Sequence, residues 1–223
     1  MSSGRVRVNG RVVTEMGAKV DPAVDVVTVD GRAVSIAEKP SYLMLHKPRS
    51  VMTTMKDPEG RVTVAQYVPL SEYPGLFPVG RLDFDTTGLL LFTTDGELAH
   101  RLLHPRRKVP KTYRALVDGH PDEHDTTALE SGIELDDGPT APAAVAELER
   151  VGPRSLMEIT ITEGRKRQVR RMFSAVGHPV IELERVSFGP VELGGLAAGR
   201  WRALDDAEVD ALRDAVGYEE GEA

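Results

Sequence analysis

The chain contains no cysteine among its 223 residues, which excludes disulfides, thiolate metal sites and cysteine nucleophiles. It also has no run of 18 apolar residues long enough to span a membrane, and its N-terminus, MSSGRVRVNG, lacks the apolar centre of a secretory signal peptide. A phosphate-binding loop, a dinucleotide-binding glycine motif and a nucleophile elbow are missing as well. These absences predict a cytoplasmic protein without a membrane partner and give no indication of a bound cofactor.

A sizeable core is nevertheless expected, because 40% of the residues are hydrophobic. The length fits one large domain, or a main domain with a small appendage. Within 5–35, alternating valines around Asn9-Gly10 and Asp30-Gly31 predict two small β-hairpins. Pro and Gly punctuate 68–80, which predicts a loop there.

The rest of the chain mixes strand and helix patterns without a regular alternation. The expected strands lie at 42–46, 89–92, 112–117, 155–162 and 179–186. The expected helices are one capped by Thr94 that runs to His104, one over 165–176 and one over 205–216. This order favours an α+β fold with a largely antiparallel sheet.

The net charge of −7 is concentrated at one end of the chain. Residues 205–223 hold eight acids and one arginine, so the remaining residues sum to zero. Within that balanced part, 101–114 has six Lys or Arg and no acid, and 164–171 has five and no acid. Such clusters are either two solvated basic faces or a surface for a polyanion such as nucleic acid.

The run GRLDFDTTGLLLFTTDG (80–96) places two carboxylates, Asp83 and Asp85, just before an apolar segment. Both could serve only to cap a backbone turn, or one could act chemically at a cleft. If the segment is extended, their side chains point in opposite directions, which disfavours a shared acid–base pair. An arginine that flanks the apolar stripe of the helix over 165–176 could then keep an enclosed aspartate ionised.

His100 and His104 have the i, i+4 spacing of two metal ligands on a helix. The glutamate of an H-E-x-x-H motif is missing, and no third ligand is evident. Ordinary histidines beside basic residues explain the pair as well, so no metal site is expected.

Three segments together resemble the bacterial rRNA pseudouridine synthases that modify a single uridine. The segments are YLMLHKPRSVMTT (42–54), GRLDFDTTGLLLFTTDGELAHRLLHPRRKVPKTYRALVDG (80–119) and TEGRKRQVRRMFSAVGHPVIELERVSFGP (162–190). The resemblance spans about 5–215. It implies the pseudouridine synthase fold, with a mixed, mostly antiparallel sheet flanked by helices, and isomerisation of uridine without cofactor or metal.

Each site residue follows from its place in these motifs. The Asp of G-R-L-D implies that Asp83, and not Asp85, is catalytic, while Tyr113 matches the aromatic that stacks on the target uracil and Arg170 the basic residue that salt-bridges the catalytic aspartate. Arg81 matches an arginine that contacts RNA, and Leu183 falls where an aliphatic side chain packs against the base. Further residues expected to contact RNA or line the site are Lys47, Lys111, Arg165 and Gln168.

The resemblance also implies a domain order. Residues 1–39 are expected to be a remnant of an S4-like RNA-binding domain without its helices, 40–217 the catalytic domain and 218–223 an acidic tail. The implied partner is rRNA, as a precursor or in a partly assembled subunit, and the protein is expected to be a monomer. GIELDDGPTAP (132–142) is more similar to the large-subunit (23S) rRNA members.

Other functions stay open at this point. A small-subunit (16S) rRNA uridine is an alternative target. A non-catalytic RNA-binding or ribosome-assembly factor would have the same basic clusters, and an N-glycoside hydrolase would use an aspartate near a flipped nucleotide to admit water.

Overall fold

The computed structural model describes residues 4–21, 24–33 and 40–218, and the chain divides into two compact units, Met1–Pro40 and Ser41–Ala223. In its described part the first unit holds a four-stranded sheet, ordered β2-β1-β3-β4 and built from β1 (Val6–Val8), β2 (Arg11–Val12), β3 (Val27–Val29) and β4 (Arg32–Ala33). Both expected hairpins are confirmed, because Asn9-Gly10 and Asp30-Gly31 have the positive φ angles of tight turns. The assignment of this unit to an S4-like domain stays a prediction.

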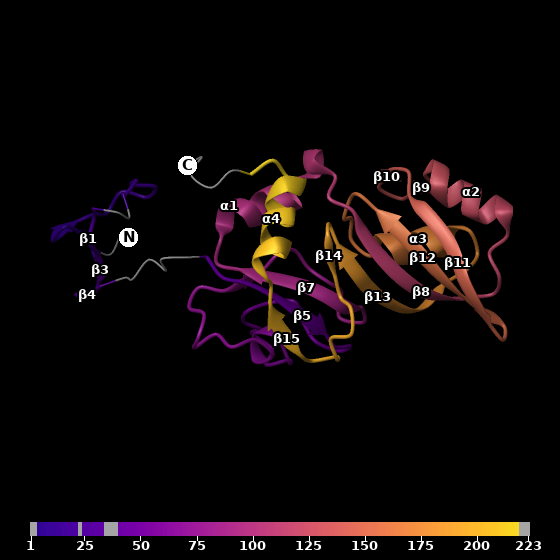
Figure 1. Ribbon diagram of the computed structural model, residues 1–223, viewed down its shortest axis with the longest axis horizontal. Helices are drawn as coiled ribbons and strands as arrows, with labels where there is room; N and C mark the ends of the chain where they lie inside the picture. Colours follow the sequence, from indigo (N-terminus) through magenta and orange to yellow (C-terminus); the bar gives the residue numbers. More distant parts are fainter. Residues whose placement is uncertain (1–3, 22–23, 34–39, 219–223) are drawn as a thin grey trace. The chain divides into compact units, whose positions relative to one another are not determined.

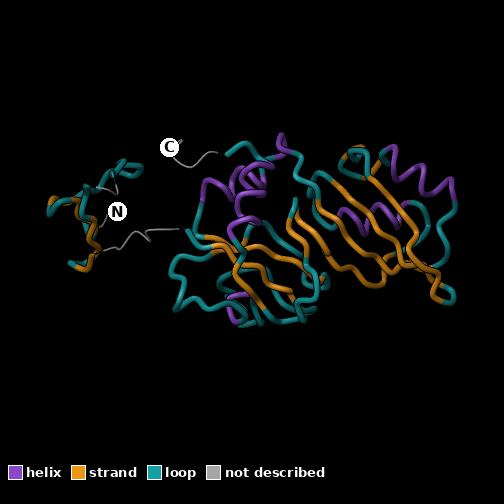
Figure 2. The backbone as a smooth tube through the Cα atoms, viewed as in Figure 1, coloured by secondary structure: helices purple, strands orange, loops and turns teal. Residues whose placement is uncertain are grey.

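A nine-stranded mixed sheet dominates the second unit (Figures 1 and 2). Its main path runs β11-β12-β8-β13-β7-β5-β15, with β14 beside β13 and β6 beside β7. The strands are β5 (Tyr42–Lys47), β6 (Phe77–Pro78), β7 (Thr87–Thr93), β8 (Lys111–Asp118), β11 (Ala144–Val151), β12 (Arg154–Ile161), β13 (Val180–Phe188), β14 (Val191–Glu192) and β15 (Trp201–Ala203). Only β7 and β13 pair in parallel, so the α+β class and the mostly antiparallel sheet are confirmed for the described residues.

Helices cover both faces of this sheet and bury two apolar clusters against it. The helices are α1 (Gly96–Leu103), α2 (Glu123–Ser131), α3 (Gln168–Ala175) and α4 (Asp206–Ala215), with short 3₁₀ turns at Val64–Gln66 and Pro105–Arg107. Leucines of α1 and α4 pack into one cluster, whereas Met172 and Phe173 of α3 pack into the other. Figure 1 shows α3 and α1 beside different parts of the sheet. A small hairpin of β9 (Glu134–Leu135) and β10 (Gly138–Pro139) lies near α3.

Two helix starts differ from the sequence prediction. Asp95, not Thr94, caps α1, since its carboxylate accepts the Leu98 backbone N–H while the Thr94 hydroxyl accepts from Ser41. The helix α3 starts at Gln168 because Arg167 has a left-handed backbone (φ 51°, ψ 32°). The acidic tail beyond Tyr218 lies outside the described residues, and no described helix is long and apolar enough to cross a membrane.

A histidine–glutamate pair links β5 to β13 and predicts a pH dependence of stability. His46 Nε2 lies 3.2 Å from Glu184 Oε1; the hydrogen bond raises the pKa of His46 above 6.5 and lowers that of Glu184 below 4.5. The His46 contribution is therefore complete below pH 6.5 and is lost as pH rises through its folded pKa, whereas the Glu184 contribution is present above pH 4.5 and is lost as pH falls.

Glu184→Gln should therefore lower the free energy of unfolding most between about pH 4.5 and 6.5. Because Glu184 is partly exposed, the loss should reach at most about 1 kcal/mol. Urea unfolding at pH 5.5 and pH 8.5 measures it, with the exposed Glu182→Gln on the same strand as control. An equal loss at both pH values would contradict the ion pair.

Candidate active site

The loop 81–86 contains Asp83 and leads into β7. Hydrogen-bond donors from other segments of the chain hold its backbone in place. Three donors bond to its backbone carbonyls: Ser50 N to Phe84 O (2.8 Å), Thr53 Oγ1 to Leu82 O (2.7 Å) and Lys47 Nζ to Thr86 O (2.9 Å). Within the loop, Thr86 N donates to Asp83 O at 3.1 Å. These bonds hold the Asp83 backbone in one position without using its carboxylate, which stays available at the site.

Lys47 is buried against this loop and bonds to its backbone. Its side chain is fully buried, and its amine donates to Pro48 O (3.0 Å) and Thr86 O. Burial lowers the pKa of Lys47 to about 8, and the Asp83 and Asp85 carboxylates act in the opposite direction. This buried position favours a supporting role for Lys47 beneath the loop, while its expected contact with RNA stays a prediction. The residue brings a cation close to the two aspartates.

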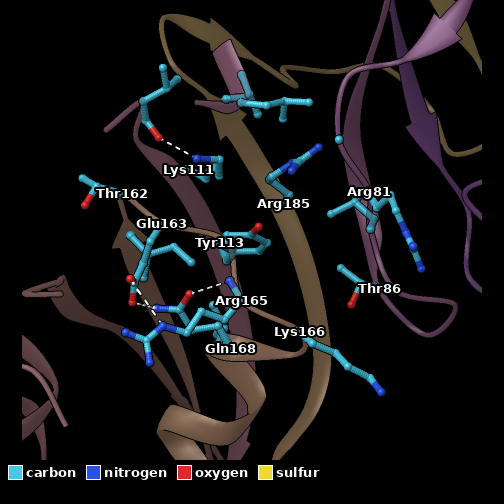
Figure 3. A pocket seen from close by; sticks show the side chains of 18 of the residues that line it. Arg81, Thr86, Lys111, Tyr113, Thr162, Glu163, Arg165, Lys166, Gln168 and Arg185 are labelled. Carbon is cyan, nitrogen blue, oxygen red and sulfur yellow. Dashed lines mark hydrogen bonds and ion pairs between the residues drawn. The ribbon is translucent and has the colours of Figure 1, made fainter. Parts of the chain in front are cut away.

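A cavity of about 700 Å³ opens in front of the loop, and most of the expected site residues line it (Figure 3). The expected residues along its wall are Arg81, Asp83, Lys111, Tyr113, Arg165, Gln168 and Leu183. A volume of this size suits a nucleotide-sized ligand. Asp85 and Arg170 are not among the lining residues.

The two aspartates of the loop have separate surroundings. Asp85 receives two hydrogen bonds from Arg167, at 2.9 and 3.0 Å, and these lower the pKa of Asp85. Asp83 lines the cavity instead. These surroundings support the interpretation that only one of the two aspartates acts at the cleft. Asp83 lines the cavity, whereas Asp85 is paired with Arg167 and Arg170.

Arg170 makes its ion pair with Asp85 and not with Asp83. Its Nη2 lies 3.4 Å from Asp85 Oδ2 and 3.1 Å from Asp85 O, and its Nη1 donates to Val180 O at 3.0 Å. Among the described residues, the expected direct pairing of Arg170 with Asp83 is not formed, since the Asp85 carboxylate receives Arg170 instead and Asp83 lines the cavity. Asp83 still interacts with Arg170 electrostatically and acts against the fall in the pKa of Arg170 that burial causes.

Tyr113 and Leu183 form the floor of the cavity. Tyr113 on β8 is 9% exposed and Leu183 on β13 is 5% exposed. Tyr113 pairs with Arg185 of β13 in the sheet, so Tyr113, Leu183 and Arg185 present their side chains on one face. Arg81 is exposed at the rim of the same cavity. The ring and the aliphatic side chain thus lie where a flat base can be held.

Arg165 and Gln168 are occupied by the protein itself. The Arg165 guanidinium donates to Gly138 O (2.8 Å) and to Pro139 O, which ties it to the β9–β10 hairpin. Gln168 is 3% exposed; its amide accepts from Arg165 N (3.0 Å) and donates to Glu163 (2.6 Å). Gln168 is therefore a buried link that shapes the cavity wall, and the Arg165 head group is bound to the hairpin. Their expected contacts with RNA stay predictions.

Two polar groups in the cavity wall are absent from the sequence-based prediction. The Thr86 hydroxyl and Arg185 Nη2 are buried and have no hydrogen-bond partner among the described residues. Figure 3 shows Arg185 and Tyr113 extending from neighbouring strands toward the loop that carries Arg81 and Thr86. Strand periodicity contained a signal for Arg185, because a residue two positions after Leu183 shares its face.

Comparisons with known proteins agree with this geometry. The family model described as RNA pseudouridylate synthase matches residues 41–175. A relative from Aquifex aeolicus, named an uncharacterized RNA pseudouridine synthase, is 46% identical over 96% of this chain and 86% of its own length. Ribosomal large subunit pseudouridine synthase B of Bacillus subtilis is 44% identical over 96% of this chain and 87% of its own. A crystal structure of a pseudouridylate synthase superposes with a TM-score of 0.74 at 32% identity, over 95% of this chain and 90% of that chain.

Proposed function

Since the chain belongs to the RNA pseudouridine synthase family, and is therefore an isomerase, we propose that it converts one specific uridine of large-subunit (23S) rRNA to pseudouridine with Asp83 as the catalytic carboxylate. The observation that carries the proposal is the cavity in which Asp83 lies with Tyr113 and Leu183. Relatives named for the large ribosomal subunit, at 40–44% identity, support the choice of RNA. A 16S rRNA uridine is the alternative target.

The target uridine leaves its stack to enter the cavity, which costs a few kcal/mol. The N1–C1′ bond breaks, the uracil turns, and a C5–C1′ bond forms, so that no atom enters or leaves. Asp83 acts as the nucleophile at C1′ or at C6, or as the base at C2′. Each of these roles requires an ionised carboxylate, and the buried cations Lys47 and Arg170 interact electrostatically with it.

The RNA backbone is bound at the rim. Arg81 and Lys166 line the cavity and are exposed, and Lys166 extends away from the floor in Figure 3. Contacts of such cations with phosphates release counterions, so affinity should fall with salt. We propose that the enzyme acts in the cytoplasm as a monomer and without a cofactor.

Incubation of unmodified 23S and 16S rRNA with the protein tests this function. Carbodiimide labelling and primer extension should map one pseudouridine in 23S rRNA and none in 16S rRNA. A single site in 16S rRNA would move the target to the alternative. RNA binding with no product from either RNA would favour a non-catalytic assembly factor.

Tyr113→Ala should slow turnover more than it weakens binding. Stacking on an aromatic ring contributes about 1–3 kcal/mol per base, and Tyr113 offers it only after the base has entered the cavity. Single-turnover rates should therefore fall by roughly 10- to 100-fold, while the Kd from fluorescence anisotropy changes by less than about 3-fold. Tyr113→Phe keeps the ring and is the matched control. A change in Kd alone would contradict the stacking role.

A further inference from the structure

Arg185 is a buried cation without an ion pair among the described residues. Its side chain is 2% exposed, its Nε donates to Leu89 O at 2.8 Å, and its Nη2 is buried without a partner. An unpaired buried charge costs several kcal/mol, even after the protein relaxes around it. A position in the cavity wall suggests that the missing partner is a ligand rather than another part of the protein.

A second cation lies beside it on the same aromatic ring. Lys111 Nζ is 5.4 Å and Arg185 Cζ 5.2 Å from the centre of the Phe188 ring, and Lys111 donates to Val109 O at 2.8 Å. Burial, followed by the Arg185 charge, lowers the pKa of Lys111 to about 8. No described carboxylate forms an ion pair with either residue. This wall of the cavity can therefore bind a negatively charged group.

The position of Arg185 indicates which part of the nucleotide carries that charge. Arg185 is paired in the sheet with Tyr113, and both line the cavity with Asp83. A flipped nucleotide inserts its base and leaves its phosphates on the RNA backbone, where Arg81 and Lys166 are exposed. A cation as buried as Arg185 lies at the depth of the base and out of reach of the backbone.

We propose that Arg185, with Lys111 beside it, binds the uracil ring as the anion that forms when the glycosidic bond breaks. This inference rests on the proposed function. Both electrons of the N1–C1′ bond stay on N1 and spread to O2 and O4, so the detached ring carries one negative charge. C1′, which loses that electron pair, is held meanwhile as an ester of Asp83 or, after loss of the C2′ proton to Asp83, as a glycal. The guanidinium stabilises the charge of the ring and retains the ring while it turns; C5 then bonds to C1′ as the ester bond breaks or the C2′ proton returns, the C5 proton passes to water, and N1 takes a proton from water. Preorganised donors aimed at developing charge are worth about 10²–10³-fold in rate.

Arg185→Met removes the positive charge and tests its role, whereas Arg185→Lys keeps a positive charge at the same position. We expect single-turnover pseudouridine formation to fall about 100-fold in Arg185→Met, with a Kd for RNA within about 3-fold of wild type, and to recover at least about tenfold in Arg185→Lys. Arg150→Met, in an exposed Arg150–Glu147 pair on β11, is the control and should leave the rate unchanged. The thermal midpoint of Arg185→Met should not fall, because an unpaired buried charge is removed.

A substrate substituent separates this role from a structural one. The substrate is RNA that carries 5-fluorouridine at the target position. Because fluorine withdraws electrons, it stabilises the departing anion, so the rate of glycosidic cleavage should depend less on the positive charge of Arg185. The loss in glycosidic cleavage caused by Arg185→Met, measured by mass spectrometry of digested nucleosides, should shrink from about 100-fold to about 10-fold or less. An equal loss with uridine and 5-fluorouridine, or a lower midpoint that accounts for the loss, would overturn the inference. Failure of the wild type to modify either rRNA would instead overturn the proposed function.

Discussion

Asp83→Asn is expected to reduce pseudouridine formation by at least about 10³-fold, since a neutral amide can act neither as the nucleophile nor as the base. The effect should lie in the rate and not in binding, because the backbone of the loop 81–86 is held by donors that do not use the Asp83 carboxylate. Single-turnover rates on a 23S rRNA fragment measure the first quantity, and fluorescence anisotropy measures the second.

Asp85→Asn is the matched control, two residues away on the same loop. Asp85 pairs with Arg167 and Arg170 rather than lining the cavity, so its loss should lower the stability of the loop and reduce the rate by much less than Asp83→Asn does. If Asp85→Asn were the more inactive variant, the assignment of Asp83 would be wrong.

Gly88→Ala should cost about 3 kcal/mol or more in the free energy of unfolding. Gly88 has φ +105°, and an added Cβ would lie 2.2 Å from Arg185 O and 2.5 Å from Arg185 N. These atoms belong to the backbone of β13, which pairs in parallel with β7 at this point. The steric clash can therefore be removed only if the two strands move apart. Activity should fall together with stability, because the loop that holds Asp83 leads into β7, while Leu183 and Arg185 lie on β13.

Gly75→Ala distinguishes the clash from backbone strain alone. Gly75 also has a positive φ, +84°, but nothing lies within 4 Å of its added Cβ. This variant should therefore lose only about 1 kcal/mol in the free energy of unfolding. Urea denaturation of both variants measures the difference, and similar losses would show that the close approach of β7 and β13 is not critical.

The sequence allowed much of the second unit to be predicted because its patterns are local. The stripe of Met172 and Phe173 marks α3, and the strands at 112–117 and 155–162 follow apolar alternation. The strand at 42–46 is marked instead by consecutive apolar residues, which are buried on both faces of the sheet. The strand β11 has no such pattern, since most of its side chains are exposed, so the sequence does not predict it. The apolar stripe predicts a start of α3 at 165, earlier than Gln168, because periodicity contains no signal for the left-handed backbone of Arg167.

Side-chain partners in the site were harder to predict than residue identities. The motif predicts a basic residue beside the catalytic aspartate, yet it does not contain the information that Arg170 contacts Asp85. The motif likewise does not show that the Lys47 amine donates to two backbone carbonyls, one of them in the loop. Such choices depend on which atoms lie within about 3 Å after folding, and motif spacing does not contain that information.

The fate of the C5 hydrogen at the target uridine tests the central claim most directly, because bonding of C5 to C1′ must release it. With rRNA labelled at C5 with tritium, the wild type should release tritium in step with pseudouridine formation at one site, without free uracil, and Asp83→Asn should release none above background. Tritium release by Asp83→Asn at the wild-type rate, or free uracil without tritium release, would contradict an isomerase that works through Asp83.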